Sequence, residues 1–491
     1  MQSRYGTYVL SEFGGVGDDT FDNTPILQSL IDRCYSNGGG TICIPAGRFR
    51  SGTVVLKDNV GLYLEAGAEL RAVEDMGAFP ILEPTMSANY KMFFRHALIY
   101  AESAHNISID GAGTLDGRGD SAVFARKSAV APERYMHRPA LVRLVDSSRV
   151  RIKNISIRDA ASWSVHLMHC QDVHVHGITL HSRGPNYNND GIDIDSCEAV
   201  RVSDCTIDSE DDAISIKATS ANPCRRVLVS NCTLSSNCNA VRVGAENFGG
   251  FEDIRLSNCT IHDSAVGIAF QNIDGYPMRG IAFNGFTLRG VGVPIYMITN
   301  RKSYPVGIPL ENYEVAQGDH PHQIEDISFT DIQGYGLGHY RGVAAIARFV
   351  EESYYTPAVF SGHPEARLCG LTLSNVRLRY ETTSTDAGVD KTARVTDPNE
   401  ELAPGKRPYP VFGLLIRHAC KVAIHNLVIE STGADPRPAV GLENVTNALL
   451  AGVHLPAPAD SAAIRTFNCS DIDVAPPGVL TTEEWPGPFT T

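Results

Sequence analysis

Five segments of the chain repeat one pattern: VHVHGITL at residues 173–180, VRVSDCTI at 200–207, VLVSNCTL at 227–234, IRLSNCTI at 254–261 and IAFNGFTL at 281–288. Each copy begins 27 residues after the previous one, and the same position in every copy is a threonine. Looser copies begin at Val150, Ile327, Leu371 and Val422. A period between about 20 and 50 residues is typical of solenoids and propellers.

The segments between the copies decide which solenoid this is. They are short runs of alternating β-branched residues separated by Gly, Asn, Asp and Ser, and none is long enough for an amphipathic helix. This pattern excludes helical and leucine-rich repeats and predicts an all-β fold, a parallel β-helix. In such a fold residues 27 apart lie one above another, about 4.8 Å per coil, and side chains alternate between the core and the surface.

The repeat predicts one β-helix domain over residues 1–491. The segment 23–35 (NTPILQSLIDRCY) has apolar residues at helical spacing, and Asn23 or Thr24 is placed to cap it. We expect this helix to cover the open end of the stack, where an unpaired sheet edge would otherwise be exposed. Insertions interrupt the coils at about 80–97, 118–137, 303–325, 334–366 and 383–412.

Composition excludes several classes of function. Lys and Arg number 42 against 56 Asp and Glu, a net charge of −14, which argues against a nucleic-acid or anionic-membrane partner. No apolar run is long enough to span a membrane. We expect a cytoplasmic protein, or a secreted or periplasmic one if an export signal was removed. The twelve cysteines are too dilute for a disulfide scaffold, and none forms a paired CxxC arrangement. We assign no chemistry to the repeating cysteines Cys205, Cys232 and Cys259.

A second strand of each coil can be aligned by the same kind of spacing, with steps of 27, 22, 27, 27 and 27 residues. Its blocks are WSVHLM from Trp163, DGIDID from Asp190, DAISIK from Asp212, NAVRVG from Asn239, VGIAFQ from Val266 and VPIYMI from Val293. Apolar residues occupy the inward columns, so the alternate positions face outward. One outward column contains His166, Asp193, Ser215, Arg242, Ala269 and Tyr296, and the next contains Met168, Asp195, Lys217, Gly244, Gln271 and Ile298.

Acidic residues gather beside these columns. Asn188 and Asp190 precede one strand and the pair Asp211–Asp212 precedes the next, with Asp193 close by. Carboxylates held together cannot all ionise freely, so one pKa should rise and supply a general acid while the others remain bases. The alternative is that Asp and Asn occupy strand-to-turn junctions for their turn chemistry. A whole cluster on one stripe, with cations interleaved, favours a site.

These residues carry a resemblance to a known family. NNDGIDIDSC, DDAISIKA, SWSVHLMHC, RPALV at Arg138 and the N-terminal EFGGVGDDTFDNTPILQSLID together resemble the polygalacturonases, glycoside hydrolase family 28, over roughly residues 8–300. The resemblance implies a right-handed, single-stranded, pectin-lyase-like β-helix. It also implies that Asp211 is the general acid and that Asp190 and Asp212 activate water on the opposite face, with inversion of the anomeric centre.

Two family elements are absent. The His of the family's Gly-His-Gly element is replaced by Asn239, and its carboxylate-binding Arg-x-Lys falls on Ala269 and Gln271. Arg242, one coil earlier than Ala269, either reaches the same region or packs as a surface arginine. These losses indicate a sugar other than plain galacturonate at the cleaved position.

We therefore expect an inverting, exo-acting glycosidase without metal or organic cofactor. Its partner is an oligosaccharide or polysaccharide of the pectin or a related plant or microbial type. Alternatives are a polysaccharide lyase on the same scaffold or a non-catalytic glycan-binding β-helix. We expect the substrate to be bound by Asn188, Asp193, His166, Lys217, Asn239, Arg242, Gln271 and Tyr296. Structural roles compete for His166, Lys217 and Tyr296, respectively a turn contact, an ion pair and wall packing.

Overall fold

The structure is a computed structural model that describes residues 6–85, 95–125, 137–272, 276–299, 323–338, 357–381, 409–456, 462–476 and 482–484. The described residues form two compact units, the first ending at Cys232 and the second beginning at Thr233. The expected single domain over 1–491 stays a prediction. Among the described residues no helix is long and apolar enough to cross a membrane.

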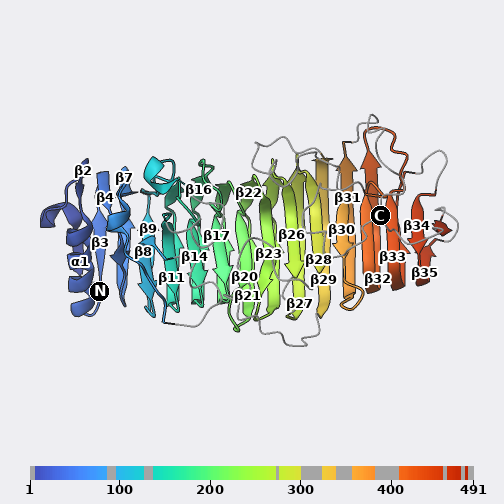
Figure 1. Ribbon diagram of the computed structural model, residues 1–491, viewed down its shortest axis with the longest axis horizontal. Helices are drawn as coiled ribbons and strands as arrows, with labels where there is room; N and C mark the ends of the chain where they lie inside the picture. Colours follow the sequence, from blue (N-terminus) through green and yellow to red (C-terminus); the bar gives the residue numbers. More distant parts are fainter. Residues whose placement is uncertain are drawn as a thin grey trace. The chain divides into compact units, whose positions relative to one another are not determined.

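The first unit is built from short parallel strands that stack side by side (Figure 1). Its elements are β1 (Gly6–Val9), η1 (Leu10–Phe13), β2 (Asp18–Asp22), α1 (Thr24–Ser36), β3 (Gly40–Ile44), β4 (Gly47–Ser51), β5 (Val54–Val55), β6 (Val60–Leu64), β7 (Ala68–Ala72), η2 (Met76–Ala78), β8 (Ala97–Glu102), β9 (Ser108–Gly111), β10 (Thr114–Asp116), η3 (Ala122–Phe124), β11 (Ala140–Val145), β12 (Ser148–Lys153), β13 (Ser156–Arg158), β14 (Val165–Met168), β15 (Gln171–His176), β16 (Thr179–Ser182), β17 (Ile192–Asp195), β18 (Glu198–Ser203), β19 (Thr206–Ser209), β20 (Ile214–Ala218) and β21 (Cys224–Ser230).

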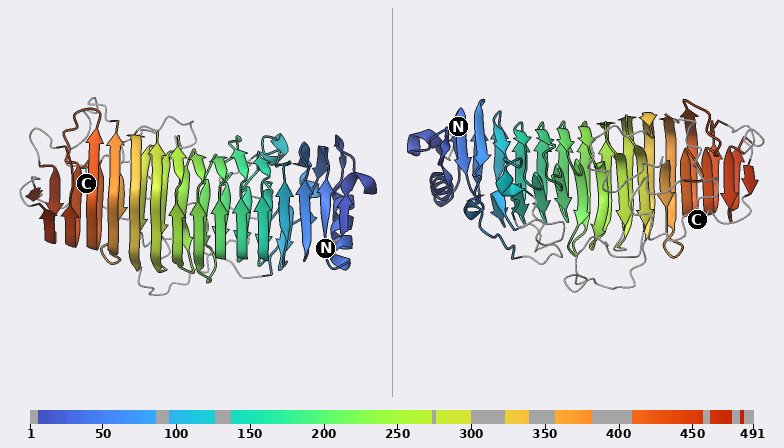
Figure 2. Two further views of the ribbon diagram at one scale, coloured as in Figure 1. Left: turned by 180° about the vertical axis from the view of Figure 1, so that it is seen from behind. Right: turned by 45° about the horizontal axis from the view of Figure 1, so that its top comes forward.

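Three ladders of strands run through this unit. One ladder is β8, β11, β14, β17 and β20, the second is β9, β12, β15, β18 and β21, and the third is β10, β13, β16 and β19. Successive strands of one ladder belong to successive coils, and Figure 2 shows the same stacking from two further sides. This arrangement confirms the predicted parallel β-helix.

Hydrophobic columns form the core between the ladders. Val165, Ile192 and Ile214 are register partners on β14, β17 and β20, and all three are fully buried. Burial of each such side chain contributes about 1.5–3 kcal/mol relative to exposure. This register agrees with the one predicted from the 27-residue and 22-residue spacings of the sequence. The residues between these apolar positions therefore face outward.

The turns between coils use a left-handed backbone conformation. Asn154, Gly177, Asp204 and Asn231 take the same place in successive coils with φ of 61°, 65°, 58° and 56°. Asn, Asp and Gly adopt this conformation at lower cost than other residues. Asn231 Nδ2 also donates to Asp204 Oδ1 at 3.3 Å, which links two turns.

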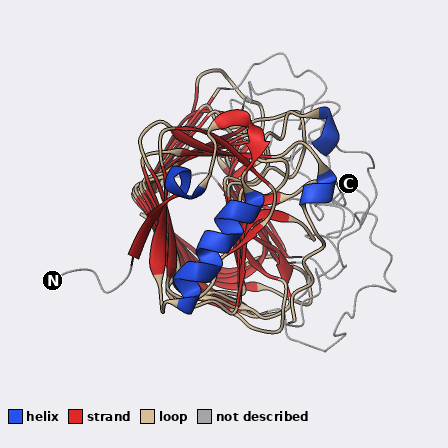
Figure 3. Cartoon of the chain, turned by 90° about the vertical axis from the view of Figure 1, so that its left-hand side faces the viewer, coloured by secondary structure: helices blue, strands red, loops and turns tan. Residues whose placement is uncertain are grey.

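Helix α1 lies across the end of the first unit, as expected (Figure 3). Its Leu27, Leu30, Ile31 and Cys34 are buried against the first coils. Asn23 is the N-cap residue, one of the two positions expected, but its side chain bonds to Val16 and makes no capping bond to the helix. The Thr24 N–H donates to Asp22 Oδ1 at 3.0 Å.

The second unit repeats the architecture with longer strands that bend from one face to the next. They are β22 (Thr233–Ser236), β23 (Asn239–Asn247), β24 (Phe251–Ser257), β25 (Thr260–His262), β26 (Val266–Asn272), β27 (Met278–Arg289), β28 (Val293–Thr299), β29 (Ile324–Leu337), β30 (Ala358–Ser361), β31 (Leu368–Tyr380), β32 (Leu414–Ser431), β33 (Val440–Ala451), β34 (Ile464–Phe467), β35 (Ser470–Ala475) and β36 (Thr482–Glu484). Val241, Ile268 and Ile295 continue as one inward column.

Strand bounds correct the expected insertions. Strand β29 contains both the end of the 303–325 segment and the start of the 334–366 segment, and β30 lies inside the latter. The loose copy at Ile327 marked the middle of β29, but the repeat was too degenerate to show the ends of β29 or to show β30. Most of the remainder of these segments, most of 383–412, and parts of 80–97 and 118–137 lie outside the described residues.

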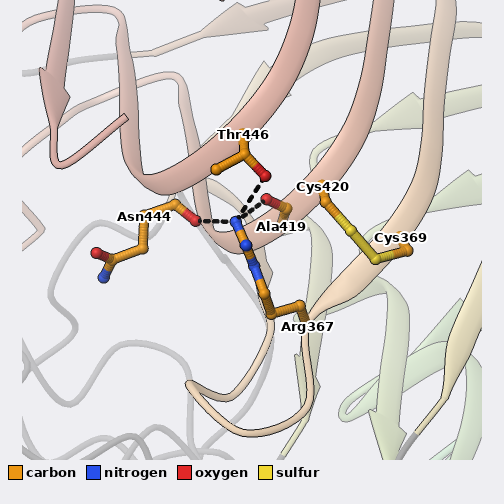
Figure 4. Close-up of a disulfide and its surroundings, with 6 residues drawn as sticks. All are labelled: Arg367, Cys369, Ala419, Cys420, Asn444 and Thr446. Atoms are coloured by element: carbon orange, nitrogen blue, oxygen red, sulfur yellow. Dashed lines mark hydrogen bonds between the residues drawn. A yellow bond between two sulfur atoms is a disulfide. The ribbon is translucent and has the colours of Figure 1, made fainter. Parts of the chain in front are cut away.

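A disulfide joins two coils of the second unit, between two cysteines that lie outside the repeating set of Cys205, Cys232 and Cys259. Cys369 on β31 and Cys420 on β32 are register partners, with Cα atoms 4.7 Å apart (Figure 4). Arg367 Nη2 donates beside it to the Ala419 and Asn444 carbonyls at 2.6 and 2.8 Å. Both cysteines stand two residues before loose repeat copies, at Leu371 and Val422, which was the available signal.

We expect loss of this disulfide to destabilise the second unit. The bond closes a loop with a sequence separation of 51, so the double variant Cys369→Ser/Cys420→Ser should lose about 3–4 kcal/mol of unfolding free energy. Urea unfolding followed by circular dichroism measures the loss. The matched control is Cys469→Ser, which removes a free thiol of the same unit. An equal midpoint for both variants would contradict a stabilising disulfide.

Candidate active site

The segment that carries Asp190 is held in place by hydrogen bonds to other segments of the first unit. Arg138, buried before β11, donates to the Tyr187 carbonyl and to the Ala161 carbonyl. Asn186 Nδ2 donates to the Gly119 and Phe124 carbonyls at 2.7 and 3.2 Å. These bonds fix a segment without regular structure on the wall of the first unit, so the residues that follow have a defined position.

Asp190 and Asp212 are brought together by the coil stacking itself. The Gly191 N–H donates to the Asp212 carbonyl at 2.8 Å, which ties the two coils at this point. A Cβ on Gly191 would lie 2.3 Å from the Ala213 carbonyl oxygen, so only glycine fits here. Asp190 and Asp212 are both buried.

Asp211 lies at the more exposed edge of the same cluster. Asn188 Nδ2 donates to Asp211 Oδ2 at 3.3 Å, and the Asp212 N–H donates to Asp211 Oδ1 at 3.1 Å. Asn188 has the left-handed φ of 60°, which directs its amide in this position. The structure therefore joins Asn188, Asp190, Asp211 and Asp212, as the sequence predicted, although they come from two coils.

The outward columns add a cation to the acidic cluster. Lys217 Nζ lies 3.8 Å from Asp193 Oδ1 and 5.0 Å from the centre of the Trp163 ring. Both Lys217 and Asp193 are buried, so their attraction is little weakened by solvent. Lys217 thus forms an ion pair with Asp193, one of the two roles expected for it, beside the catalytic candidates.

A second buried pair forms between His166 and Asp195. His166 Nε2 lies 3.5 Å from Asp195 Oδ2, and Thr219 donates to Asp195 through N–H at 2.8 Å and Oγ1 at 2.6 Å. Burial raises the pKa of Asp195, but the His166 and Thr219 contacts outweigh burial and hold it below its ordinary value. Burial lowers the pKa of His166, so a neutral imidazole beside a charged carboxylate is favoured.

The pKa of one carboxyl group of this cluster, that of Asp190, is raised. Burial is the main cause, followed by the charges of Asp193, Asp211 and Asp212, and together they raise the pKa of Asp190 well above 3.8. Its Oδ1 atom accepts no hydrogen bond from the described residues. A buried carboxyl with a raised pKa beside other carboxylates is the arrangement that general acid–base catalysis requires.

Three other predicted residues belong to the second unit. Arg242 Nη2 donates to Gln271 Oε1 at 2.9 Å, from one coil to the next. Asn239 Nδ2 contacts Cys238 Sγ at 3.2 Å. The guanidinium of Arg242 is thus partly engaged by the residue that replaces the family's lysine.

Tyr296 occupies a different environment from the one predicted. Only 1% of its surface is exposed, and it packs in an apolar cluster with Ala269, Val359 and Tyr409. A ring covered in this way packs the wall of the second unit and does not offer a face to a sugar. The sequence showed its column but not the covering segment near Tyr409.

Three residues that contribute to the site were not among the predicted site residues. Asp195 lies beside His166 and accepts from Thr219, and Trp163 lies against both Lys217 and His166. The sequence signal for Asp195 was its place in the second outward column, two residues after Asp193. Neither Trp163 nor Thr219 carried a sequence signal beyond its nearness to that column.

Comparison with known proteins identifies the family of this chain. The model of glycosyl hydrolases family 28 matches residues 34–336. A probable polygalacturonase of Vitis vinifera is 30% identical over 195 residues, which cover 38% of this chain and 39% of that protein. The match therefore spans less than half of the curated relative's length. The expected cytoplasmic location receives no support from this family.

Solved structures show the fold. An exopolygalacturonase of Thermotoga maritima aligns with a TM-score of 0.66 at 18% identity, covering 86% of this chain and 91% of that one. A family 28 exopolygalacturonase of Yersinia enterocolitica has the same TM-score and identity, with coverage of 90% and 78%. These neighbours confirm the right-handed, pectin-lyase-like β-helix.

The raised pKa of Asp190 predicts a pH-dependent stability. Between about 3.8, its ordinary pKa, and its raised pKa, the native state holds a proton that the unfolded chain has released. The free energy of unfolding contributed by this group therefore falls as pH rises through that window. Asp190→Asn should raise the melting temperature at about pH 7 by at least about 1 °C, and by less at about pH 4.

Differential scanning calorimetry at both pH values checks this expectation. Asp204→Asn is the matched control, because Asp204 is a surface turn residue whose place is taken by Asn231 in the next coil. An Asp190→Asn variant that is less stable than the parent at about pH 7 would show that the ionised carboxylate stabilises the fold.

Proposed function

Because the chain belongs to glycosyl hydrolases family 28, we propose that it is an inverting glycosidase acting on a pectin-type or related glycan. The observation that carries the proposal is the cluster of Asp190, Asp211 and Asp212, held on neighbouring coils with the pKa of Asp190 raised by burial. Hydrolysis with inversion needs one carboxyl group to protonate the leaving oxygen and another to take a proton from water.

The roles within the cluster follow from exposure and charge. Asp211, at the open edge, gives its proton to the leaving glycosidic oxygen, in line with the family pattern. Asp190 and Asp212 activate the attacking water, and Asp190, whose pKa is raised, accepts its proton. The alternative assignment, in which the protonated Asp190 is the acid, rests on the same raised pKa and predicts different behaviour of the variants.

The second unit supports a sugar other than plain galacturonate at the cleaved position. Ala269 and Gln271 cannot bind a carboxylate as cations, and the Arg242 guanidinium donates to Gln271. Two of the solved structures that share the fold are named exopolygalacturonases, and this supports exo action.

A location outside the cytoplasm is part of the proposal. The bond between Cys369 and Cys420 is of a kind that persists in oxidising compartments and is rare in the cytosol. This replaces the cytoplasmic expectation.

Removal of the proposed acid should abolish turnover. Asp211→Asn should lower kcat by about 10²–10⁴-fold on any glycan that the parent protein hydrolyses. Neutral and acidic pectic oligosaccharides are the substrates, and proton NMR of the first product reads both its anomer and its size. Asp204→Asn should retain parental activity.

The expected product is a single sugar of inverted configuration, formed equally with and without a chelator. An unsaturated, ultraviolet-absorbing product that disappears with a chelator would establish a lyase. An Asp211→Asn variant with unchanged turnover would remove the catalytic assignment.

Leaving-group dependence separates the acid from the base. An aryl glycoside with an acidic phenol needs little protonation, so the acid variant should regain most of its activity on it, whereas a base variant should not. We expect recovery of at least about tenfold for Asp211→Asn relative to the natural glycoside, and none for Asp190→Asn. The opposite result would assign the acid to Asp190.

A further inference from the structure

A buried arginine lies on the same outward face as the acidic cluster. Arg143 on β11 is the register partner of His166, which is in turn the partner of Asp193. Its neighbours Val142 and Leu144 face the core, so Arg143 points to the outer side with His166. Only 1% of its surface is exposed.

The carboxylates near Arg143 are bonded to other groups. Glu102 accepts from the Tyr100 hydroxyl at 2.8 Å and from the N–H and Oγ1 of Thr85, both at 2.7 Å. Asp195 accepts from Thr219 and lies beside His166. Both carboxylates interact with the charge of Arg143, but neither accepts a hydrogen bond from it.

Two donors of the guanidinium therefore lack an acceptor. Nε and Nη1 of Arg143 are buried and have no hydrogen-bond partner among the described residues. Burial lowers the pKa of Arg143 to about 10, so it is still charged at neutral pH. Burying a charge whose donors are unpaired raises the free energy of the folded state. In a site, such a group is typically one that pairs with a ligand.

We propose that Arg143 binds the carboxylate of a uronic acid residue that neighbours the cleaved sugar in the same glycan chain. This inference rests on the proposed function and gives its substrate class, a glycan with a non-galacturonate sugar at the cleaved position and a uronate beside it. The planar guanidinium matches a carboxylate through two parallel hydrogen bonds. Its long, rotatable stem lets the buried donors turn toward the entering ligand.

The experiment compares two oligosaccharides that differ only in that neighbouring sugar, galacturonate in one and its methyl ester in the other. Arg143→Met should raise KM for the acidic substrate by at least about tenfold, with kcat changed by less than about threefold, and should leave KM for the ester unchanged. Arg143→Lys should restore part of the loss. The control Arg149→Met removes an exposed arginine of the same coil.

Calorimetric titration with sodium galacturonate separates this inference from the proposed function. Binding by the parent and by Arg143→Lys but not by Arg143→Met supports the inference even if no glycan is hydrolysed. Equal binding by parent and Arg143→Met, no binding by the parent, or an equal rise of KM for acid and ester would each overturn it. Circular dichroism spectra and melting temperatures verify that the variants are folded.

Discussion

The in-register stacking of parallel strands is the constraint on which the rest of each unit depends. Once Val165, Ile192 and Ile214 form one buried column, the period of two along a strand assigns every neighbouring side chain to the core or to the surface. A slip of one residue would place the aspartates inside and the aliphatic residues outside. The hydrophobic columns therefore fix the site as firmly as they fix the fold.

This rigidity allows the first unit to hold charges together that repel one another. Asp190, Asp193 and Asp212 are buried on neighbouring coils, and burial with mutual repulsion raises the pKa of Asp190. A flexible loop would separate such groups, whereas a backbone bond such as Gly191 N–H to the Asp212 carbonyl cannot lengthen without breaking the ladder. The strain of the cluster is balanced by the many apolar contacts of the core.

The polar groups around the cluster differ in how many of their atoms are hydrogen-bonded or ion-paired within the protein. Asp195 is bonded to Thr219 and paired with His166, and Lys217 is held between Asp193 and Trp163. These residues have the character of supports that fix the shape and charge of the site. Arg143, with two buried donors unpaired, has the character of a group that acts on a ligand.

The sequence by itself determined the β-helix, the register of its columns and the grouping of Asn188, Asp190, Asp211 and Asp212. It could do so because a solenoid converts a fixed sequence spacing into spatial contact between neighbouring coils. Only the tertiary structure decided how burial acts on each group. Tyr296 is covered by the segment near Tyr409, and Cys369 meets Cys420 across a degenerate part of the repeat. Burial, pairing and pKa depend on which segments pack over a column, and that packing has no period in the sequence.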